Sequence, residues 1–195
     1  GRRRLMCPDA SARAGVRSAD AEPRLRAFFA LWPPEAVRSA LLGWAQACRA
    51  STAGRLVRRE NLHATLAFLG EIDRSRLPEL AVLAQELVAE RFELVLDRVG
   101  YWSHNGIVYA AAESMPAPLS ALAGALALRL AGAGFRIEER SYFAHVTLLR
   151  AARRAPAGVR VASLRWQVDT LALVQSVRSG GRLVYRPLER WTLAD

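Results

Sequence analysis

The sequence predicts an α+β fold made of short strands and a few helices. Segments with strand-like and helix-like patterns are mixed along the chain, without the regular alternation of a doubly wound parallel sheet. Three segments repeat apolar residues at helical spacing, whereas the others alternate or form short apolar runs. The chain has 195 residues, of which 52% are hydrophobic and 24% charged, so it can bury a substantial core.

The predicted elements follow from these patterns in order. The first strand is an apolar run that ends at Pro33 and Pro34, and Pro34 suits the first turn of the helix that follows. The predicted strands cover residues 25–32, 55–57, 62–69, 92–102, 107–112, 143–150, 166–177 and 183–188. The predicted helices cover residues 36–50, 73–90 and 115–131.

Turn and cap residues delimit several of these elements. Asp73 can cap the second helix at its N-terminus, and Gly132 and Gly134 can end the third helix. Residues 103–106, Ser-His-Asn-Gly, form a turn between two strand-like segments and therefore predict a hairpin. Residues 179–181, Ser-Gly-Gly, separate the closing pair of strands.

The composition of the chain limits the classes of protein to which it can belong. Residues 1–23 show no periodicity and predict a flexible basic tail, which leaves residues 24–195 as a single domain. The net charge is +10 and all 28 basic residues are arginines, which favours a partner that carries phosphate. Two cysteines, Cys7 and Cys48, make no disulfide framework. No apolar stretch suits a membrane span or a secretory signal, so we expect a cytoplasmic protein without membrane contact.

A short pattern, H-x-T-L, occurs twice and includes two of the three histidines. The first copy is residues 63–66, His-Ala-Thr-Leu, and the second is residues 145–148, His-Val-Thr-Leu. Residues i and i+2 of a strand share a face, so each histidine projects with its threonine. The opposite, apolar faces are expected to pack under helices, and they carry Ala64, Leu66 and Phe68 in one strand and Val146 and Leu148 in the other.

If the two polar faces meet across a groove, their side chains suit hydrolysis of a phosphodiester without a metal. One histidine can take a proton from water while the other gives a proton to the leaving oxygen. The hydroxyls of Thr65 and Thr147 can hold the non-bridging phosphate oxygens. Arg150, at the end of the second strand, can offset the developing charge. No cluster of cysteines or carboxylates accompanies the histidines, so we expect neither a metal nor another cofactor.

Other polar and aromatic residues have plainer interpretations. His104 lies in the predicted turn and is expected to be solvated. The arginine pairs at 58–59 and 153–154 either face solvent or form a basic rim around the two motifs. Tyr142, Phe143 and Trp102 are expected to pack rather than to stack on bases.

The paired motifs and their surroundings resemble the two-histidine (2H) phosphoesterase superfamily, specifically its branch of RNA 2′,3′-cyclic phosphodiesterases, also called LigT-like or 2′-5′ RNA ligases. The resemblance runs from about residue 25 to residue 193. It rests on LRAFFALWPPE near the start, NLHATLAFLGE and HVTLLR around the histidines, and RLVYRPLERWTL near the end.

The resemblance implies a bilobal fold with two antiparallel sheets, outer helices and pseudo-twofold symmetry around a central cleft. It also implies that His63 donates a proton to the 3′ leaving oxygen and that His145 accepts the proton of the attacking water. Thr65 and Thr147 match the phosphate-holding hydroxyls. The family commonly has proline before the second histidine, where this chain has Ala144, so a restraint on the backbone is missing at the strand entry.

The expected activity is hydrolysis of 2′,3′-cyclic phosphates, on RNA ends or nucleotides, to 2′-phosphomonoesters by a monomer. A close alternative is reversible 2′-5′ RNA ligation of tRNA halves, because the same residues serve both directions. Other activities of the superfamily, on ADP-ribose cyclic phosphate or oligoadenylates, remain open. An alternative of another class is a non-catalytic, arginine-rich RNA-binding module, which would bind with a steep salt dependence and tolerate replacement of both histidines.

Overall fold

The computed structural model describes residues 23–138 and 141–194. The predicted tail, residues 1–23, lies outside the described residues except for Pro23. The helices are α1 (Glu35–Thr52), α2 (Leu77–Gln85) and α3 (Ala117–Gly132), with the short 3-10 turns η1 (Arg59–Asn61) and η2 (Arg74–Arg76). The strands are β1 (Arg24–Leu31), β2 (Arg55–Leu56), β3 (Ala64–Asp73), β4 (Phe92–Leu96), β5 (Arg98–Trp102), β6 (Ile107–Ala111), β7 (His145–Arg150), β8 (Leu164–Val168), β9 (Thr170–Ser179) and β10 (Arg182–Thr192).

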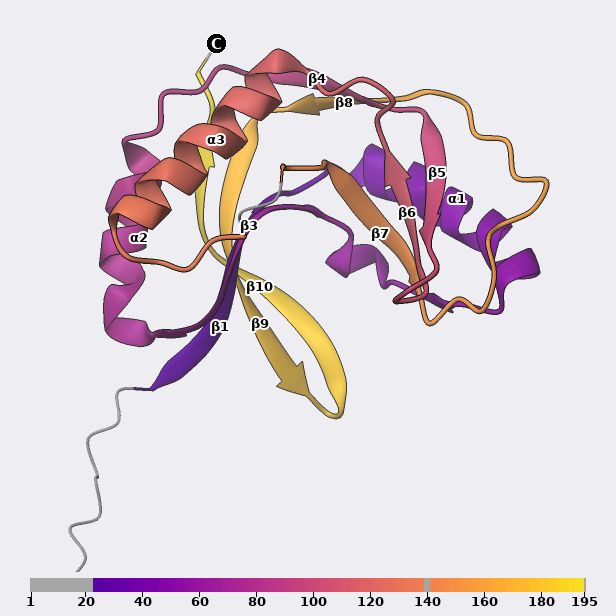
Figure 1. Cartoon of the computed structure of the whole chain (residues 1–195), viewed down its shortest axis with the longest axis horizontal. Helices are drawn as coiled ribbons and strands as arrows, with labels where there is room; N and C mark the ends of the chain where they lie inside the picture. The colour runs from indigo at the N-terminus through magenta and orange to yellow at the C-terminus, as the bar shows by residue number, and fades with distance from the viewer. Residues whose placement is uncertain (1–22, 139–140, 195) are drawn as a thin grey trace, which may run out of the picture.

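The strands form one large sheet and one small one, which confirms the predicted α+β class. The large sheet has the order β10-β9-β1-β3-β7-β6-β5, with β2 also paired to β7, and the small sheet pairs β4 with β8. All pairs between these strands are antiparallel. A single residue pair joins β3 to β7. The large sheet therefore consists of two halves that meet at that pair, β10-β9-β1-β3 and β7-β6-β5 with β2 (Figure 1).

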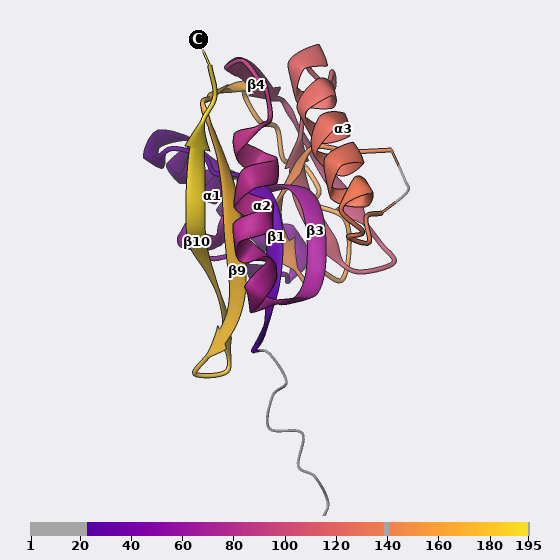
Figure 2. The same ribbon diagram turned by 90° about the vertical axis from the view of Figure 1, so that its left-hand side faces the viewer.

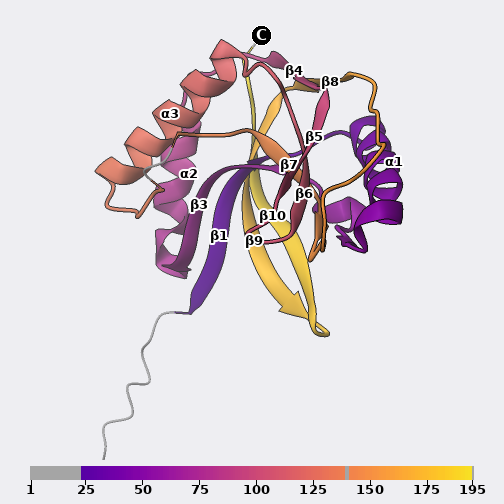
Figure 3. The ribbon, with the colours of Figure 1, turned by 45° about the vertical axis from the view of Figure 1, so that its right-hand side comes forward.

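The helices flank the two halves. Helix α1 contacts β7 and β8, whereas α3 contacts β3, and α2 contacts α3 and β10. In Figure 2, α2 lies in front of β1, and Figure 3 shows α1 on one side of the strands with α2 and α3 on the other. The largest fully buried side chains include Trp166, Phe29, Leu31, Leu41, Leu62 and Leu94. Within the described residues no helix is long and apolar enough to cross a membrane.

Strand β1 is buried on both faces from Ala27 to Leu31, because that stretch is apolar without alternation. Phe29 and Leu31 point into the main core. Phe28 and Ala30 point to the opposite face, where they pack in a second cluster with Val174 of β9. This second cluster supports the surface that carries the first H-x-T-L motif.

The second predicted helix, residues 73–90, is shorter than expected. Strand β3 extends to Asp73, η2 follows, and α2 covers only Leu77–Gln85. Pro78 lacks an N–H group and fits only the first turn of a helix, so it sets the start of α2. The Asp73 side chain makes no capping hydrogen bond and instead lies 3.4 Å from Arg24 Nε.

Two predicted strands, residues 92–102 and 166–177, are each divided between two sheets. The first breaks at Asp97 into β4 and β5, and the second breaks at Asp169 into β8 and β9. Aspartate is a poor strand residue, and both of these chain corners use its hydrogen-bonding groups. Asp97 accepts the Glu113 N–H through its side chain, and the Asp169 carbonyl accepts the Leu193 N–H. The other predicted elements are present, with ends that differ by a few residues.

The predicted hairpin at residues 103–106 is confirmed. Strands β5 and β6 pair from Arg98 with Ala111 to Trp102 with Ile107. Gly106 has a φ of 65°, and a Cβ atom there would lie 2.8 Å from the Ala152 carbonyl oxygen. Only glycine fits this turn, because both its conformation and the close approach of the chain exclude a side chain.

Candidate active site

The two H-x-T-L motifs meet at their middle residues. Ala64 of β3 and Val146 of β7 are the only partners that join the two strands, and both side chains are fully buried. Extending this antiparallel register by one residue places His63 opposite Thr147 and Thr65 opposite His145. All four of these side chains line one cleft, on the face opposite the two buried residues. The meeting of the two polar faces, predicted from strand periodicity, is thus confirmed.

The His63 ring is fixed by hydrogen bonds at both nitrogens. Its Nδ1 atom lies 2.7 Å from the carbonyl oxygen of Asn61, and its Nε2 atom lies 3.1 Å from Thr65 Oγ1. A carbonyl oxygen only accepts, so Nδ1 carries the hydrogen and donates it. Nε2 is therefore the nitrogen whose protonation changes when the ring titrates.

His145 is oriented in the same way in the other half. Its Nδ1 atom donates to the carbonyl oxygen of Phe143, at 3.0 Å. Each histidine thus uses the carbonyl two residues before it, so the two imidazoles repeat one local geometry. The same reasoning places the hydrogen of His145 on Nδ1 and leaves Nε2 as the nitrogen that can accept a proton.

The surroundings of His63 favour the neutral imidazole. Burial lowers the pKa of His63 to about 4, and the positive charges of Arg150 and His145 act in the same direction. The hydrogen bond to the Asn61 carbonyl opposes this shift in the His63 pKa but is outweighed. At neutral pH and without a ligand, His63 Nε2 therefore carries a lone pair.

Arg150 reaches the cleft because of a bulge in β7. Along β6, Val108 pairs with Leu149 and the next residue, Tyr109, pairs with Thr147, so Leu148 is skipped. The bulge reverses the alternation of side chains after Thr147, and Arg150 lines the cleft although it is three residues further on. The structure thus brings together all five residues that the sequence singled out, His63, Thr65, His145, Thr147 and Arg150.

The predicted position of Phe68 is wrong for the same reason. Thr65 pairs with Ala30 of β1, but Ala67 pairs with Phe29, so Leu66 is skipped. The bulge turns Phe68 to the cleft, where its side chain is 39% exposed, instead of under the helices. Simple alternation cannot reveal a bulge, because the pattern of apolar residues remains plausible on either side of it.

Aromatic rings that sequence reasoning did not assign to the site surround His63. The Trp32 ring is stacked at 8° and 5.6 Å from the His63 ring. The rings of Phe28 and Tyr185 lie 4.8 and 4.9 Å away. In the sequence, only the aromatic content of the opening apolar run and of the last strand pointed to these rings. These rings account for the burial that lowers the pKa of His63.

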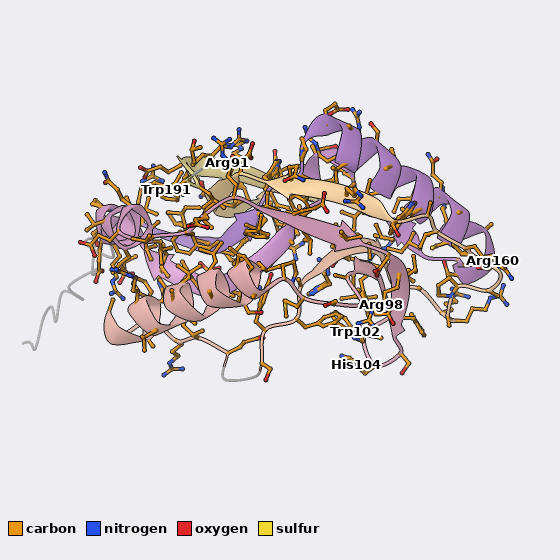
Figure 4. The ribbon with its side chains drawn as sticks, turned by 90° about the horizontal axis from the view of Figure 1, so that it is seen from above. Arg91, Arg98, Trp102, His104, Arg160 and Trp191 are labelled. Carbon is orange, nitrogen blue, oxygen red and sulfur yellow. The ribbon has the colours of Figure 1, made fainter. Side chains whose placement is uncertain are left out.

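A second aromatic group, expected only in part, surrounds His145. Its ring centroid lies 4.7 Å from that of Trp102, 5.9 Å from that of Tyr109 and 6.0 Å from that of Phe143. Trp102 ends β5, and its ring centroid lies 6.4 Å from that of His104 in the hairpin turn (Figure 4). A Cβ atom on Gly100 would lie 2.3 Å from the Tyr109 ring, so glycine lets that ring cross β5.

The cleft is large and strongly basic. Its volume is about 2020 Å³, and eight arginines and two glutamates line it. Four of the arginines belong to the His63 half (Arg24, Arg26, Arg178 and Arg182) and four to the His145 half (Arg55, Arg58, Arg98 and Arg150). Among the residues that the structure describes, no group of three histidine, cysteine or acidic side chains could hold a metal ion.

Of the two arginine pairs, at residues 58–59 and 153–154, only one residue lines the cleft. Arg58 lines the cleft, whereas Arg59 is paired with Glu35 and donates to Ser39 Oγ. Arg154 donates to the Ser51 carbonyl in the last turn of α1 and does not line the cleft. His104 is exposed in its turn, as expected.

Several known proteins are similar to this chain in sequence and in fold. A sequence model described as "LigT like Phosphoesterase" matches residues 31–109. An Escherichia coli protein named RNA 2′,3′-cyclic phosphodiesterase is 34% identical over 176 residues, which cover 89% of this chain and 99% of that protein. The chain belongs to the LigT-like phosphoesterase family.

Other members of the family agree with this assignment. A Thermus thermophilus protein of the same name is 32% identical over 187 residues, covering 87% of this LigT-like chain and 90% of that protein. The crystal structure of E. coli LigT complexed with 3′-AMP superposes with a TM-score of 0.80 at 32% identity, covering 89% of this chain and all of that one. The family resemblance and the fold predicted from the sequence are therefore confirmed.

Proposed function

We propose that this protein hydrolyses 2′,3′-cyclic phosphates, on RNA ends or nucleotides, to 2′-phosphomonoesters. The observation that carries the proposal is the pairing of Ala64 with Val146, which sets two histidines and two threonines around one point of a basic cleft. The names of the relatives support it, and so does the 3′-AMP in the E. coli LigT structure.

The chemistry needs one base and one acid. His145 Nε2 takes a proton from a water molecule as the water oxygen bonds to phosphorus. The bond from phosphorus to O3′ breaks, and protonated His63 Nε2 gives its proton to O3′. The product carries a free 3′-hydroxyl and a 2′-phosphate. The proton that His145 gains and the proton that His63 loses balance over the turnover through exchange with solvent.

The lowered pKa of His63 bears on this assignment, because an acid must enter the reaction protonated. The substrate phosphate is an anion, and beside Nε2 it favours the imidazolium and raises the pKa of His63. Binding of the cyclic phosphate therefore brings a proton to His63. Thr65 and Thr147 donate hydrogen bonds to the non-bridging oxygens, and the Arg150 guanidinium offsets the charge that develops on them.

Both motifs belong to one chain, so the proposed site is complete in one copy and we infer that a monomer is active. The cytoplasmic location expected from the sequence stays a prediction. The substrate is free RNA ends or small nucleotides, and no membrane component takes part in the proposed reaction.

A panel of 2′,3′-cyclic mononucleotides and oligonucleotides with cyclic-phosphate ends tests the proposal. Phosphorus NMR is expected to show the 2′-phosphate isomer, with a rate that EDTA leaves unchanged. His63→Ala and His145→Ala are each expected to lower turnover at least 100-fold, the lower range for general acid–base catalysis. RNA binding without turnover would reject the enzyme and favour a binding module, whereas turnover that survives both replacements would reject the two histidines as its acid and base.

A further inference from the structure

The two H-x-T-L motifs share their bulge as well as their register. In each motif the leucine is the skipped residue, Leu66 in β3 and Leu148 in β7. Each bulge then turns the residue five places after the histidine into the cleft. On β7 this residue is Arg150, and on β3 it is Phe68. The two side chains are counterparts under the pseudo-twofold symmetry of the fold.

A guanidinium is nevertheless present on the β3 side. Arg26 of β1 places its Cζ atom 4.6 Å from the centroid of the Phe68 ring. The flat guanidinium thus covers an aromatic side chain that is 39% exposed within the cleft. Arg26 makes no ion pair among the described residues, although Glu71 lies opposite it on β3. Packing of the core does not require this pair, because the main core lies on the other face of β1.

The same end of the cleft carries further positive charge. Ser176 of β9 lies opposite Arg26, and Arg178 follows two residues later on the same face of the strand. Arg182 begins β10 opposite Ser179, the residue after Arg178, and both arginines line the cleft. These arginines lie on the hairpin that extends beyond the rest of the sheet in Figure 1. The basic surface therefore continues from the histidines past Phe68 toward the end of the hairpin.

We propose that the β1–β3 half binds the RNA strand that leads into the site, with a base stacked on the Arg26–Phe68 pair and a backbone phosphate at Arg26. Aromatic rings and stacked guanidinium groups bind bases of any sequence, and arginine adds hydrogen bonds to phosphate. This inference rests on the proposed function and narrows its substrate from any cyclic phosphate to the 3′ end of an RNA chain.

The distance between Thr65 and Phe68 sets the number of RNA nucleotides that can lie between the reacting phosphate and the stacked base. The bulge at Leu66 places Thr65 opposite Ala30 and Phe68 opposite Phe28, two residues apart on β1, which is about 7 Å along a strand. Stacked nucleotides rise by about 3.4 Å each, so the Arg26–Phe68 pair lies about two nucleotides from the reacting phosphate. A cleft of about 2020 Å³ has room for such a segment, whereas pockets for a single small ligand usually hold about 300–1,000 Å³.

The experiment measures kcat/KM for cyclic-phosphate-ended oligonucleotides of one to six residues. In the wild-type protein kcat/KM is expected to rise about tenfold between one and three nucleotides, the effect of one stacked base. The readout is the ratio of the four-nucleotide to the one-nucleotide kcat/KM. Arg26→Gln and Phe68→Ala are expected to bring this ratio close to one, and Phe68→Trp is expected to keep it high because it restores an aromatic face.

Arg49→Gln is the matched control for charge. Arg49 is exposed in the last turn of α1 and does not line the cleft, so its replacement is expected to leave both rates and their ratio unchanged. A ratio close to one in the wild-type protein overturns the inference. So does a ratio in Arg26→Gln and Phe68→Ala that equals that of Arg49→Gln.

A binding measurement separates this inference from the proposed function. If no substrate turns over, the proposed function fails, and fluorescence anisotropy with 2′-phosphate-ended oligonucleotides of the same lengths then decides the inference. Affinity is expected to rise with length in the same step. The slope of log affinity against log salt is expected to be smaller by about 0.7 in Arg26→Gln, the value for one phosphate contact on a single strand. An unchanged slope and no gain with length overturn the inference.

Discussion

Ala64 and Val146 form the one residue pair between β3 and β7, and each is the middle residue of an H-x-T motif. Both of these side chains are small and fully buried. The distance between the two histidine–threonine sets depends on how closely these two backbones approach, so the pair is a sensitive place to perturb the site.

Ala64→Leu tests this dependence. Adding three carbon atoms at a fully buried position is expected to lower the free energy of unfolding by about 1–3 kcal/mol and to force the two strands apart. Ala84→Leu makes the same change in α2, away from the cleft. At a temperature where both variants are folded, cyclic-phosphate turnover is expected to fall only in Ala64→Leu. Equal rates in the two variants would show that the strand contact does not set the site.

The threonine hydroxyls can be removed with little change of shape. Thr65→Val and Thr147→Val each lose one hydrogen bond to a charged phosphate oxygen, so kcat/KM is expected to fall about 10- to 100-fold. Thr→Ser at either position keeps the hydroxyl and is expected to retain most of the rate. Thr192→Val, at the exposed end of β10, is the control. A full rate in both valine variants would remove the threonines from the proposed mechanism.

The pKa of His63 predicts a proton uptake on binding. In the free protein the NMR signals of the His63 ring are expected to titrate near pH 4, well below an ordinary histidine. Adding 2′-AMP is expected to raise that midpoint, because the phosphate stabilises the imidazolium. The affinity for 2′-AMP should then increase as the pH falls from the His63 pKa of the complex toward that of the free protein.

Arg150→Gln tests the direction in which neighbouring charge shifts the pKa of His63. The Arg150 charge contributes to the low pKa of His63, so its removal is expected to move the free-protein midpoint upward. A His63 midpoint near 6.5 in the free wild-type protein, or one that 2′-AMP leaves in place, would contradict this account of the site.

Asn61 links His63 to the last strand. Its side-chain Nδ2 donates to the Leu183 carbonyl at 3.0 Å, and its Oδ1 accepts the Tyr185 N–H at 3.3 Å. Asn61→Ala removes both hydrogen bonds from a buried position and is expected to cost about 1–3 kcal/mol of unfolding free energy. It is also expected to loosen the contact of Tyr185 with the His63 ring.

The pKa of His63 shows whether Asn61 shapes the site or only stabilises the fold. In Asn61→Ala the pKa of His63 is expected to rise toward its ordinary value, because water reaches a ring that Tyr185 covers in the wild-type protein. Gln167→Ala, which removes an exposed hydrogen bond to Glu93, is the comparison and is expected to change neither stability nor pKa appreciably. A destabilised Asn61→Ala with an unchanged His63 titration would make Asn61 a structural residue only.

The site was predictable from the sequence to the extent that it follows local periodicity. A histidine and a threonine two places apart share a strand face wherever the strand lies, so His63 with Thr65 and His145 with Thr147 could be paired before the fold was known. The repetition of the motif then suggested that the two faces meet. The hairpin at residues 103–106 was equally local, because its turn residues define it.

The features that were not predicted depend on contacts between distant parts of the chain. The exposure of Phe68 depends on the bulge at Leu66, which only the register with β1 reveals. The division of residues 92–102 into β4 and β5 depends on which partner strand each half finds. Trp32, directly after β1, and Tyr185 of β10 approach His63 from segments that no local pattern places beside it.

The two imidazoles take their orientation from the peptide backbone, through hydrogen bonds to the carbonyls of Asn61 and Phe143. Every amino acid supplies such a carbonyl. No substitution at these two positions can delete the acceptor, and only a displacement of the main chain can do so. The histidine tautomers are therefore protected against sequence drift, which leaves the surrounding positions open to adaptation to different RNA ends.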